Sequence, residues 1–263
     1  MIEQIGWPGV PLLALGAMLT VGTLLWLLSL RLRNASVVDV FWGPFFLLQA
    51  AAYAALVPDG FDGRRLLVLG LVAIWSVRLA THIASRSAGK GEDERYARWR
   101  DQHGAAWPVR SLFQVFWLQG LLAWIIGIPL LVAMSSPAGW GPLDAIGVGV
   151  WGIGFVFEAV GDHQLTAFIR DPANRGKTMR FGLWRYTRHP NYFGDAAQWW
   201  GFWLIATSAG GWWTVFAPIL MTFLLVRVSG VGLLERTIAE RREGYAEYMR
   251  TTSAFVPLPP KRG

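Results

Sequence analysis

The chain contains no cysteine, so it can form neither a disulfide framework nor a metal site with thiolate ligands. It is also poor in charge, because charged residues make up 16% of the sequence, against roughly 25% in soluble domains. Its histidines show none of the H-x-x-x-H or H-E-x-x-H spacings that hold zinc; they are His82, His103, His163 and His189. These absences predict a protein that binds no metal and is not an ordinary soluble domain.

Apolar residues dominate what is present. Hydrophobic residues make up 54% of the 263 positions and include 16 tryptophans, and the mean hydropathy is +0.37. A bilayer-spanning helix needs about 20 apolar residues, and seven such stretches lie near 9–30, 36–57, 66–86, 112–134, 143–168, 191–209 and 212–234. The sequence therefore predicts an all-α protein, an integral membrane bundle of seven transmembrane helices in a single domain over residues 1–263.

The basic residues indicate the orientation of this bundle. Nearly all of the 24 lysines and arginines lie in the loops after the first, third and fifth stretches and in the C-terminal tail, whereas the opposite loops hold only Arg64 and Arg65. Basic loops face the cytoplasm, so we expect the N-terminus outside and the C-terminus in the cytoplasm. Because topology explains the net charge of +7, we do not expect nucleic acid as a partner.

The loop before the sixth stretch is the place where chemistry is expected. It runs directly into an apolar helix, whose N-terminus offers free N–H groups and a partial positive charge that suit a phosphate. Six basic residues converge there, namely Arg170, Arg175, Lys177, Arg180, Arg185 and Arg188.

Ionisable groups within the apolar stretches are costly and usually face a cavity or a partner. Asp39 lies one turn into the second stretch, and Glu158 and Asp162 are spaced i,i+4 in the fifth. Asn191, Asp195 and Trp199 follow the same spacing in the sixth stretch and share one helix face. We expect these groups to line one polar chamber that opens to the cytoplasm. The alternative is a structural network that ties the bundle together.

Residues 147–152 match G-x-G-x-x-G by letter. The motif binds dinucleotides only between a strand and a helix, and no strand precedes it here. We therefore interpret these glycines as small residues that let two membrane helices approach closely.

The most specific motif of the chain is Arg188-His189-Pro190-Asn191-Tyr192-x-Gly194-Asp195, and it is accompanied by SVVDVFWGP at 36–44, the long stretch at 75–100, SGVGLLE at 229–235 and YMRTTSAFVP at 248–257. Together these motifs resemble those of the membrane steroid 5α-reductases and their bacterial relatives of the DUF1295 type. The R-H-P-x-Y core also resembles that of isoprenylcysteine carboxyl methyltransferases and phospholipid N-methyltransferases, which bind S-adenosylmethionine.

The resemblance to the reductases implies an enzyme of a bacterial inner membrane that binds NADPH from the cytoplasmic side. Its substrate would be a 3-oxo-Δ4 steroid or a similar hydrophobic enone that enters from the bilayer, and its reaction the reduction of the Δ4 double bond by hydride transfer. The resemblance places most of the cofactor site in residues 143–263. We expect the protein to be a monomer whose other partners are membrane lipids.

Site residues are carried over by motif from the same resemblance. Those implied to bind the cofactor are Asp162, Arg170, Lys177, Tyr186, Arg188, His189, Asn191, Asp195, Trp199 and Glu235. Trp42 and Trp75 are expected to bind the substrate, Trp75 standing where the family has a tyrosine. The resemblance also implies a catalytic Gln-Glu pair on the second helix, which this chain lacks as such. Asp39 is the only acid in the second stretch and is therefore the expected catalytic acid. A neutral Asp39, desolvated beside the chamber, would donate a hydrogen bond to the ketone oxygen.

Two other readings stay open. The first is a membrane methyltransferase that depends on S-adenosylmethionine, a cofactor without phosphate that leaves the loop charge to topology alone. The second is a lipid-binding or scaffold protein without enzymatic activity, which would bind neither cofactor.

Overall fold

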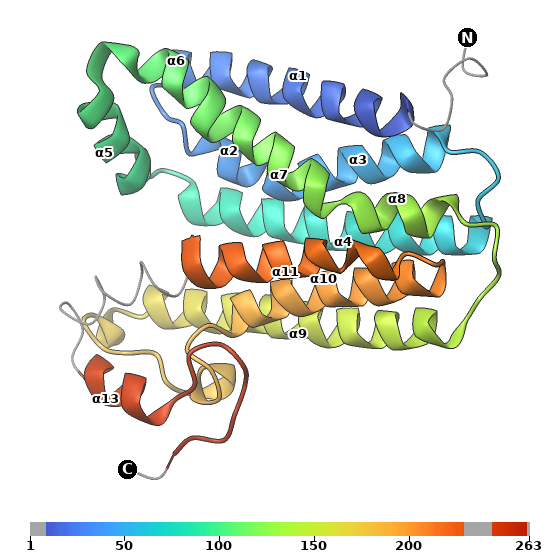
Figure 1. Cartoon of the computed structure of the whole chain (residues 1–263). Coiled ribbons are helices and arrows are strands. Elements are labelled where there is room, and N and C mark those ends of the chain that lie inside the picture. Colours follow the sequence, from blue (N-terminus) through green and yellow to red (C-terminus); the bar gives the residue numbers. More distant parts are fainter. Residues whose placement is uncertain (1–8, 229–243, 262–263) are drawn as a thin grey trace. The chain divides into compact units, whose positions relative to one another are not determined.

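The computed structural model describes residues 9–228 and 244–261 (Figure 1). These residues are helical and contain no strand, only an isolated bridge between Thr187 and Ser253. The chain divides into two compact units, Met1–Trp140 with Ala209–Gly211, and Gly141–Ser208 with Trp212–Gly263. The second begins close to residue 143, where the sequence places the start of the cofactor-binding half.

The first unit is built from long apolar helices joined by short polar turns. Its α-helices are α1 Gly9–Leu32, α2 Val37–Val40, α3 Trp42–Leu56, α4 Asp62–Ser87, α5 Glu94–His103, α6 Trp107–Ser111, α7 Leu118–Ile126 and α8 Ile128–Ser135, with a π-helical turn, Leu112–Trp117, between α6 and α7. The predicted second stretch is thus two helices, which meet at Phe41.

A buried glutamine lies at the break between α7 and α8. Gly127 and Pro129 interrupt the helix there, because proline cannot donate a backbone hydrogen bond. Gln49 of α3 donates through Nε2 to the carbonyl of Trp124 at 3.0 Å and to the hydroxyl of Tyr53 at 2.8 Å. A Cβ at Gly127 would lie 2.0 Å from Gln49 Oε1, so only glycine leaves room for this amide.

The second unit is organised by two long helices, α9 Pro142–Arg170 and α10 Pro190–Ser208, which lie side by side (Figure 1). The loop between them contains two short 3-10 turns, Pro172–Asn174 and Gly182–Arg185. The remaining elements are the 3-10 turn Trp212–Val215, α11 Phe216–Phe223, the π-helical turn Leu224–Val228 and α13 Tyr245–Thr251.

Glycines spaced seven residues apart bring α9 and α10 into close contact. A Cβ at Gly194 of α10 would lie 2.4 Å from the carbonyl oxygen of Gly154 of α9, and one at Gly201 would lie 2.7 Å from that of Gly147. By contrast, no atom of the described residues lies within 4 Å of a Cβ position at Gly149 or Gly152. The expected close helix packing is therefore confirmed at Gly147, whereas the prediction was wrong for the other two glycines of the G-x-G-x-x-G stretch.

Four helices among the described residues are long and apolar enough to cross a bilayer: Gly9–Leu32, Asp62–Ser87, Glu94–Ser135 and Pro142–Arg170. Trp42–Leu56 and Trp212–Val228 are shorter apolar helices. Large apolar side chains remain exposed on the long helices, for example Leu12 and Leu24 of α1, as a lipid-facing surface requires. These features indicate an integral membrane protein. The count of seven transmembrane helices, their orientation and the single domain stay predictions.

Candidate functional site

The loop of residues 170–188 between α9 and α10, called the basic loop below, encloses a surface hollow of about 380 Å³ beside the C-terminal end of α9. Arg170, Arg175 and Lys177 line it together with Asp171. Asp171 is occupied within the loop, since its Oδ1 accepts from the backbone N–H of Ala173 at 2.9 Å. Three cations against one carboxylate leave the hollow with a net positive charge that suits a phosphate, and Arg170 and Lys177 are two of the residues expected to bind the cofactor.

Carboxylates of α9 are paired with polar side chains of α10 along the whole interface between these two helices, called the seam below. Asp162 accepts from Asn191 Nδ2 at 3.0 Å, and Glu158 accepts from Gln198 Nε2 at 2.7 Å. At the far end, Asp144 accepts from the hydroxyl of Ser208 at 2.7 Å. These bonds fix the axial register of the two helices, because a slip of one turn would separate every pair.

The two amides leave their oxygens available. A carboxylate only accepts hydrogen bonds, so the nitrogens of Asn191 and Gln198 have to face Asp162 and Glu158. Asn191 Oδ1 and Gln198 Oε1 are buried and lack a hydrogen-bond partner within residues 9–228 and 244–261. The seam therefore presents two acceptors to a ligand that carries N–H or O–H donors.

Asp195 and Trp199 lie on the same helix as these amides. Both are buried, and the ring of Trp199 packs against Phe202 with 5.4 Å between centroids. Asn191, Asp195 and Trp199 follow one another on one face of α10, and Asp162 of α9 is paired with Asn191; that these residues line a chamber stays a prediction.

Arg188 binds the C-terminal segment. Its Nη1 donates to the carbonyls of Met249 at 2.9 Å and Thr252 at 2.6 Å, where α13 ends, and its backbone N–H donates to the carbonyl of Ser253 at 2.9 Å. Sequence reasoning did not anticipate this positioning contact, which ties the end of the basic loop to residues 245–253. A direct role of Arg188 in cofactor binding stays a prediction.

The neighbours of Arg188 in the motif differ in their exposure. His189 is buried and stacks on Tyr192, with ring centroids 5.5 Å apart and planes at 3°. The side chain of Tyr186 is exposed, while its carbonyl accepts from the backbone N–H of Leu258 at 3.0 Å. Tyr186 is thus accessible to a ligand and His189 is held by its surroundings. Glu235 lies outside the described residues.

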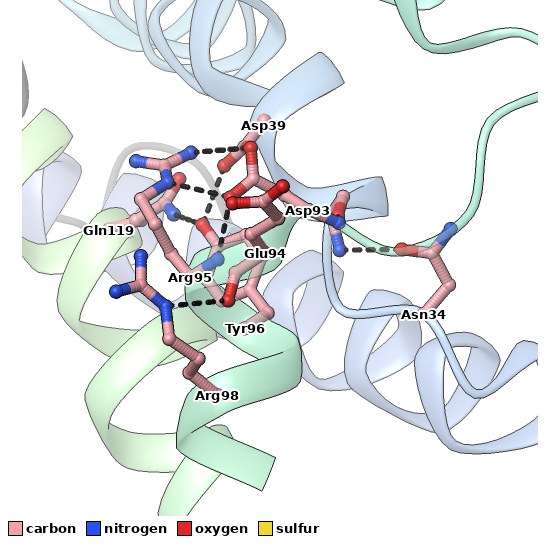
Figure 2. Close-up of polar contacts among 9 residues, drawn as sticks. Asn34, Asp39, Asp93, Glu94, Arg95, Tyr96, Arg98 and Gln119 are labelled. Atoms are coloured by element: carbon pink, nitrogen blue, oxygen red, sulfur yellow. Dashed lines mark hydrogen bonds and ion pairs between the residues drawn. The ribbon is translucent and has the colours of Figure 1, made fainter. Parts of the chain in front are cut away.

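Asp39 lies in α2, outside the four long apolar helices, in a polar cluster of the first unit (Figure 2). Its Oδ1 accepts from the hydroxyl of Tyr96 at 2.7 Å, and its Oδ2 lies 3.3 Å from Arg95 Nη2. Gln119 Nε2 contacts the Tyr96 hydroxyl at 3.4 Å. Both oxygens of Asp39 therefore accept hydrogen bonds from α5, which sequence reasoning did not identify as a partner.

Burial and these partners act on the acidity of the cluster in opposite directions. Burial raises the pKa of Asp39 above its ordinary value, although the Tyr96 hydrogen bond and the charge of Arg95 both work to lower it. Burial also works to raise the pKa of Asp93, but the hydrogen bonds from Arg95 outweigh it and leave that pKa lowered. The raised pKa has the direction that a proton donor at Asp39 needs, and the donor role stays a prediction.

Trp42 and Trp75 belong to one aromatic cluster in the first unit. Phe46 packs edge-on against both, at centroid distances of 5.2 Å to Trp42 and 5.5 Å to Trp75. Trp75 is fully buried and Trp42 is partly exposed. The two residues expected to bind substrate thus share a neighbour within one unit, whereas the expected cofactor residues lie in the other. The chamber that would unite them stays a prediction.

Comparisons with known proteins agree with the motifs. The family described as "Protein of unknown function (DUF1295)" matches residues 25–252, so the chain belongs to this family. The resemblance inferred from the motifs is thereby confirmed at family level. An uncharacterised protein of Schizosaccharomyces pombe is 28% identical over 267 residues, which cover 90% of this chain and 76% of that protein.

Two mammalian relatives have a named activity. The 3-oxo-5-alpha-steroid 4-dehydrogenase 1 of Rattus norvegicus is 37% identical over 87 residues, covering 33% of this chain and 32% of that protein. The enzyme of the same name from Mus musculus is 36% identical over 118 residues, covering 44% and 43%. The chain therefore spans less than half the length of these relatives. No solved structure matches the chain.

Proposed function

We propose that the protein is an NADPH-dependent oxidoreductase that reduces the Δ4 double bond of a 3-oxo steroid or a similar hydrophobic enone. The observation that carries this proposal is the seam of α9 and α10, where acid–amide pairs follow directly on a basic loop. The partial similarity to steroid 4-dehydrogenases supports the same reaction class. The long apolar helices support a substrate that reaches the enzyme from the bilayer.

The residues of the second unit fit the coenzyme. NADPH carries three phosphates, and the hollow lined by Arg170, Arg175 and Lys177 offers cations to bind them. Its ribose hydroxyls and carboxamide are donors, and Asn191 Oδ1 and Gln198 Oε1 are buried acceptors that need donors. S-adenosylmethionine is a cation without phosphate, so the basic hollow gives it no comparable complement.

The bound reduced nicotinamide would supply the hydride for the β-carbon of the enone, and a proton on the α-carbon would complete the saturated ketone. Charge develops on the ketone oxygen as the hydride arrives, so a hydrogen-bond donor near that oxygen lowers the barrier. Asp39, paired with Tyr96, is the proposed donor of this hydrogen bond and of the proton, which would pass through the ketone oxygen to the α-carbon while solvent restores it. The dry surroundings of the helix seam would protect the hydride from water.

Purified full-length protein in lipid nanodiscs tests the proposal. With NADPH and a panel of 3-oxo-Δ4 steroids and simpler hydrophobic enones, absorbance at 340 nm should fall while the saturated ketone forms. Thermal shifts with NADPH and with S-adenosylmethionine run in parallel, and only NADPH should stabilise the protein. Stabilisation by S-adenosylmethionine alone, without NADPH consumption on any substrate, would favour the methyltransferase reading instead.

A further inference from the structure

Gln198 is fully buried at the seam between α9 and α10. Its Nε2 donates to Glu158 Oε2 at 2.7 Å and contacts the carbonyl of Gly194 at 3.4 Å. Because a carboxylate only accepts, the reversed amide would place two oxygens against each other. Glu158 therefore holds the amide with its nitrogen inward and its oxygen turned away.

That oxygen is left without a donor. Gln198 Oε1 is buried and has no hydrogen-bond partner in the part of the chain that the structure describes. Buried acceptors of this kind are rare in native proteins. The side chain is also confined, since a Cβ at Gly154 would lie 2.9 Å from Gln198 Cγ. Gln49 Oε1 in the first unit is a second buried acceptor of this kind, but Gln198 shares its helix with the expected cofactor residues, so a ligand is the expected donor at Gln198.

Asn191 shows the same arrangement seven residues earlier. Its Nδ2 is tied to Asp162, and its Oδ1 is a buried acceptor without a partner within the described ranges. Seven residues of α-helix are two turns, or about 10 Å along the axis, so both acceptors lie on one face of α10. Asn191 lies at the helix start, beside the basic loop, and Gln198 lies further along.

We propose that Gln198 is a coenzyme-binding residue whose Oε1 accepts a hydrogen bond from the carboxamide N–H of the nicotinamide ring. This inference rests on the proposed function. With its phosphates in the basic loop, the coenzyme would extend along α10 towards Gln198, and the carboxamide is the N–H donor of its nicotinamide ring. Asn191 then contacts the part of the coenzyme nearer the phosphates. Glu158 is a positioning residue, because it determines which end of the Gln198 amide meets the ring.

Equilibrium binding to full-length protein in nanodiscs tests this assignment without turnover. We would measure Kd for NADPH and for its reduced 3-acetylpyridine analogue, in which a methyl group replaces the carboxamide NH2. The wild type should bind the analogue roughly tenfold more weakly, the usual worth of one hydrogen bond. Gln198→Leu should bring the ratio of the two Kd values close to one by weakening NADPH binding alone.

Gln49→Leu is the matched control, because Gln49 is equally buried and its amide nitrogen is also bound, but in the first unit. It should keep the wild-type ratio. Glu158→Gln serves if Gln198→Leu does not fold: an amide at position 158 can pair with the Gln198 amide in either orientation, so Gln198 Oε1 is no longer always directed at the ring. This variant should also lower the ratio.

The outcomes separate the two proposals. Two results would overturn the role of Gln198 and leave the proposed function standing. One is tight NADPH binding by the wild type with equal affinity for the analogue, and the other is a wild-type ratio of Kd values in both Gln198→Leu and Glu158→Gln. Gln198 Oε1 would then bind only a buried water. Failure of the wild type to bind either nucleotide would overturn both proposals.

Discussion

Asn191 donates to Asp162 over 3.0 Å and thereby joins the first turn of α10 to the last third of α9. The basic loop connects these two helices, so the bond closes the loop at its base. The amide of the R-H-P-N-Y motif thus makes a structural contact through its nitrogen, while its oxygen accepts no hydrogen bond from the described residues.

Exchanging the side chains of Asn191 and Asp162 tests whether their contact stabilises the protein. Asn191→Asp places two carboxylates in contact and should destabilise the protein by about 1–3 kcal/mol, the range for a lost buried hydrogen bond to a charged group. The double variant Asp162→Asn/Asn191→Asp restores the pair in reverse and should recover most of that loss. Thermal unfolding of the four proteins completes the cycle. An additive double variant would show that the two side chains do not interact.

Adding one methyl group to a glycine at the contact between α9 and α10 should force the two helices apart. In Gly194→Ala the new Cβ meets the backbone of Gly154 and Glu158 at 2.4 Å, and relieving such a clash costs about 1–3 kcal/mol. Gly149→Ala is the control on the same pair of helices, because no atom lies within 4 Å of its Cβ position. It should be neutral or slightly stabilising. Equal effects of the two substitutions in a thermal unfolding assay would contradict the close approach.

Structural features that follow from a periodic pattern of residues can be predicted from this sequence, whereas features set by a residue far away in the sequence cannot. The long apolar helices and the shared face of Asn191, Asp195 and Trp199 follow from composition and i,i+4 spacing alone. The split at Phe41 and the break at Gly127 were missed, although Pro44 and the pair Gly127 and Pro129 are local signs of a helix boundary; the length of the hydrophobic runs was given more weight. Gly149 and Gly152 were misassigned because a letter pattern does not reveal which side of a helix faces a neighbour.

The residues that contact the expected site residues were harder to predict than the site residues themselves. Gln198 was overlooked although it follows Asn191 by seven residues and shares its face, so that spacing was the available signal. Tyr96 and Arg95 reach Asp39 from more than fifty residues away, and no local pattern connects such positions. The contact of Arg188 with residues 249–253 is hidden for the same reason.

Loss of the Arg188 guanidinium should loosen the C-terminal segment. Arg188→Lys keeps the charge but has no planar group to reach the carbonyls of Met249 and Thr252. We expect faster amide hydrogen exchange, by about tenfold or more, in Tyr245–Thr251. Arg185→Lys, an exposed neighbour in the same loop, provides the control and should leave exchange unchanged. Unaltered exchange in Arg188→Lys would argue against the contact as a stabilising one.

Neutralising the hollow of the basic loop should remove preference between the two nicotinamide coenzymes. Lys177→Gln and Arg170→Gln should each weaken NADPH binding by roughly tenfold, since a charge-assisted phosphate contact contributes more than a neutral hydrogen bond. NADH lacks the 2′-phosphate, so its affinity should change less. Arg98→Gln removes an exposed charge of the first unit and should leave the NADPH-to-NADH ratio of Kd values alone. An equal loss of affinity for NADPH and NADH would show instead that these residues bind the pyrophosphate, which both coenzymes share.

The raised pKa of Asp39 makes a prediction about pH. A raised value means that the folded protein holds this proton more tightly than the unfolded chain does. The stabilisation is complete below the ordinary value of 3.8 and is lost as the pH rises through the higher folded pKa. Asp39→Asn does not titrate and keeps an acceptor for the Tyr96 hydroxyl. The Tm of the wild type should therefore fall relative to that of Asp39→Asn as the pH rises from about 4. A Tm difference that rises over this range would mean that Arg95 and Tyr96 outweigh burial, and that Asp39 is an ionised anchor for α5, unsuited to donate a proton.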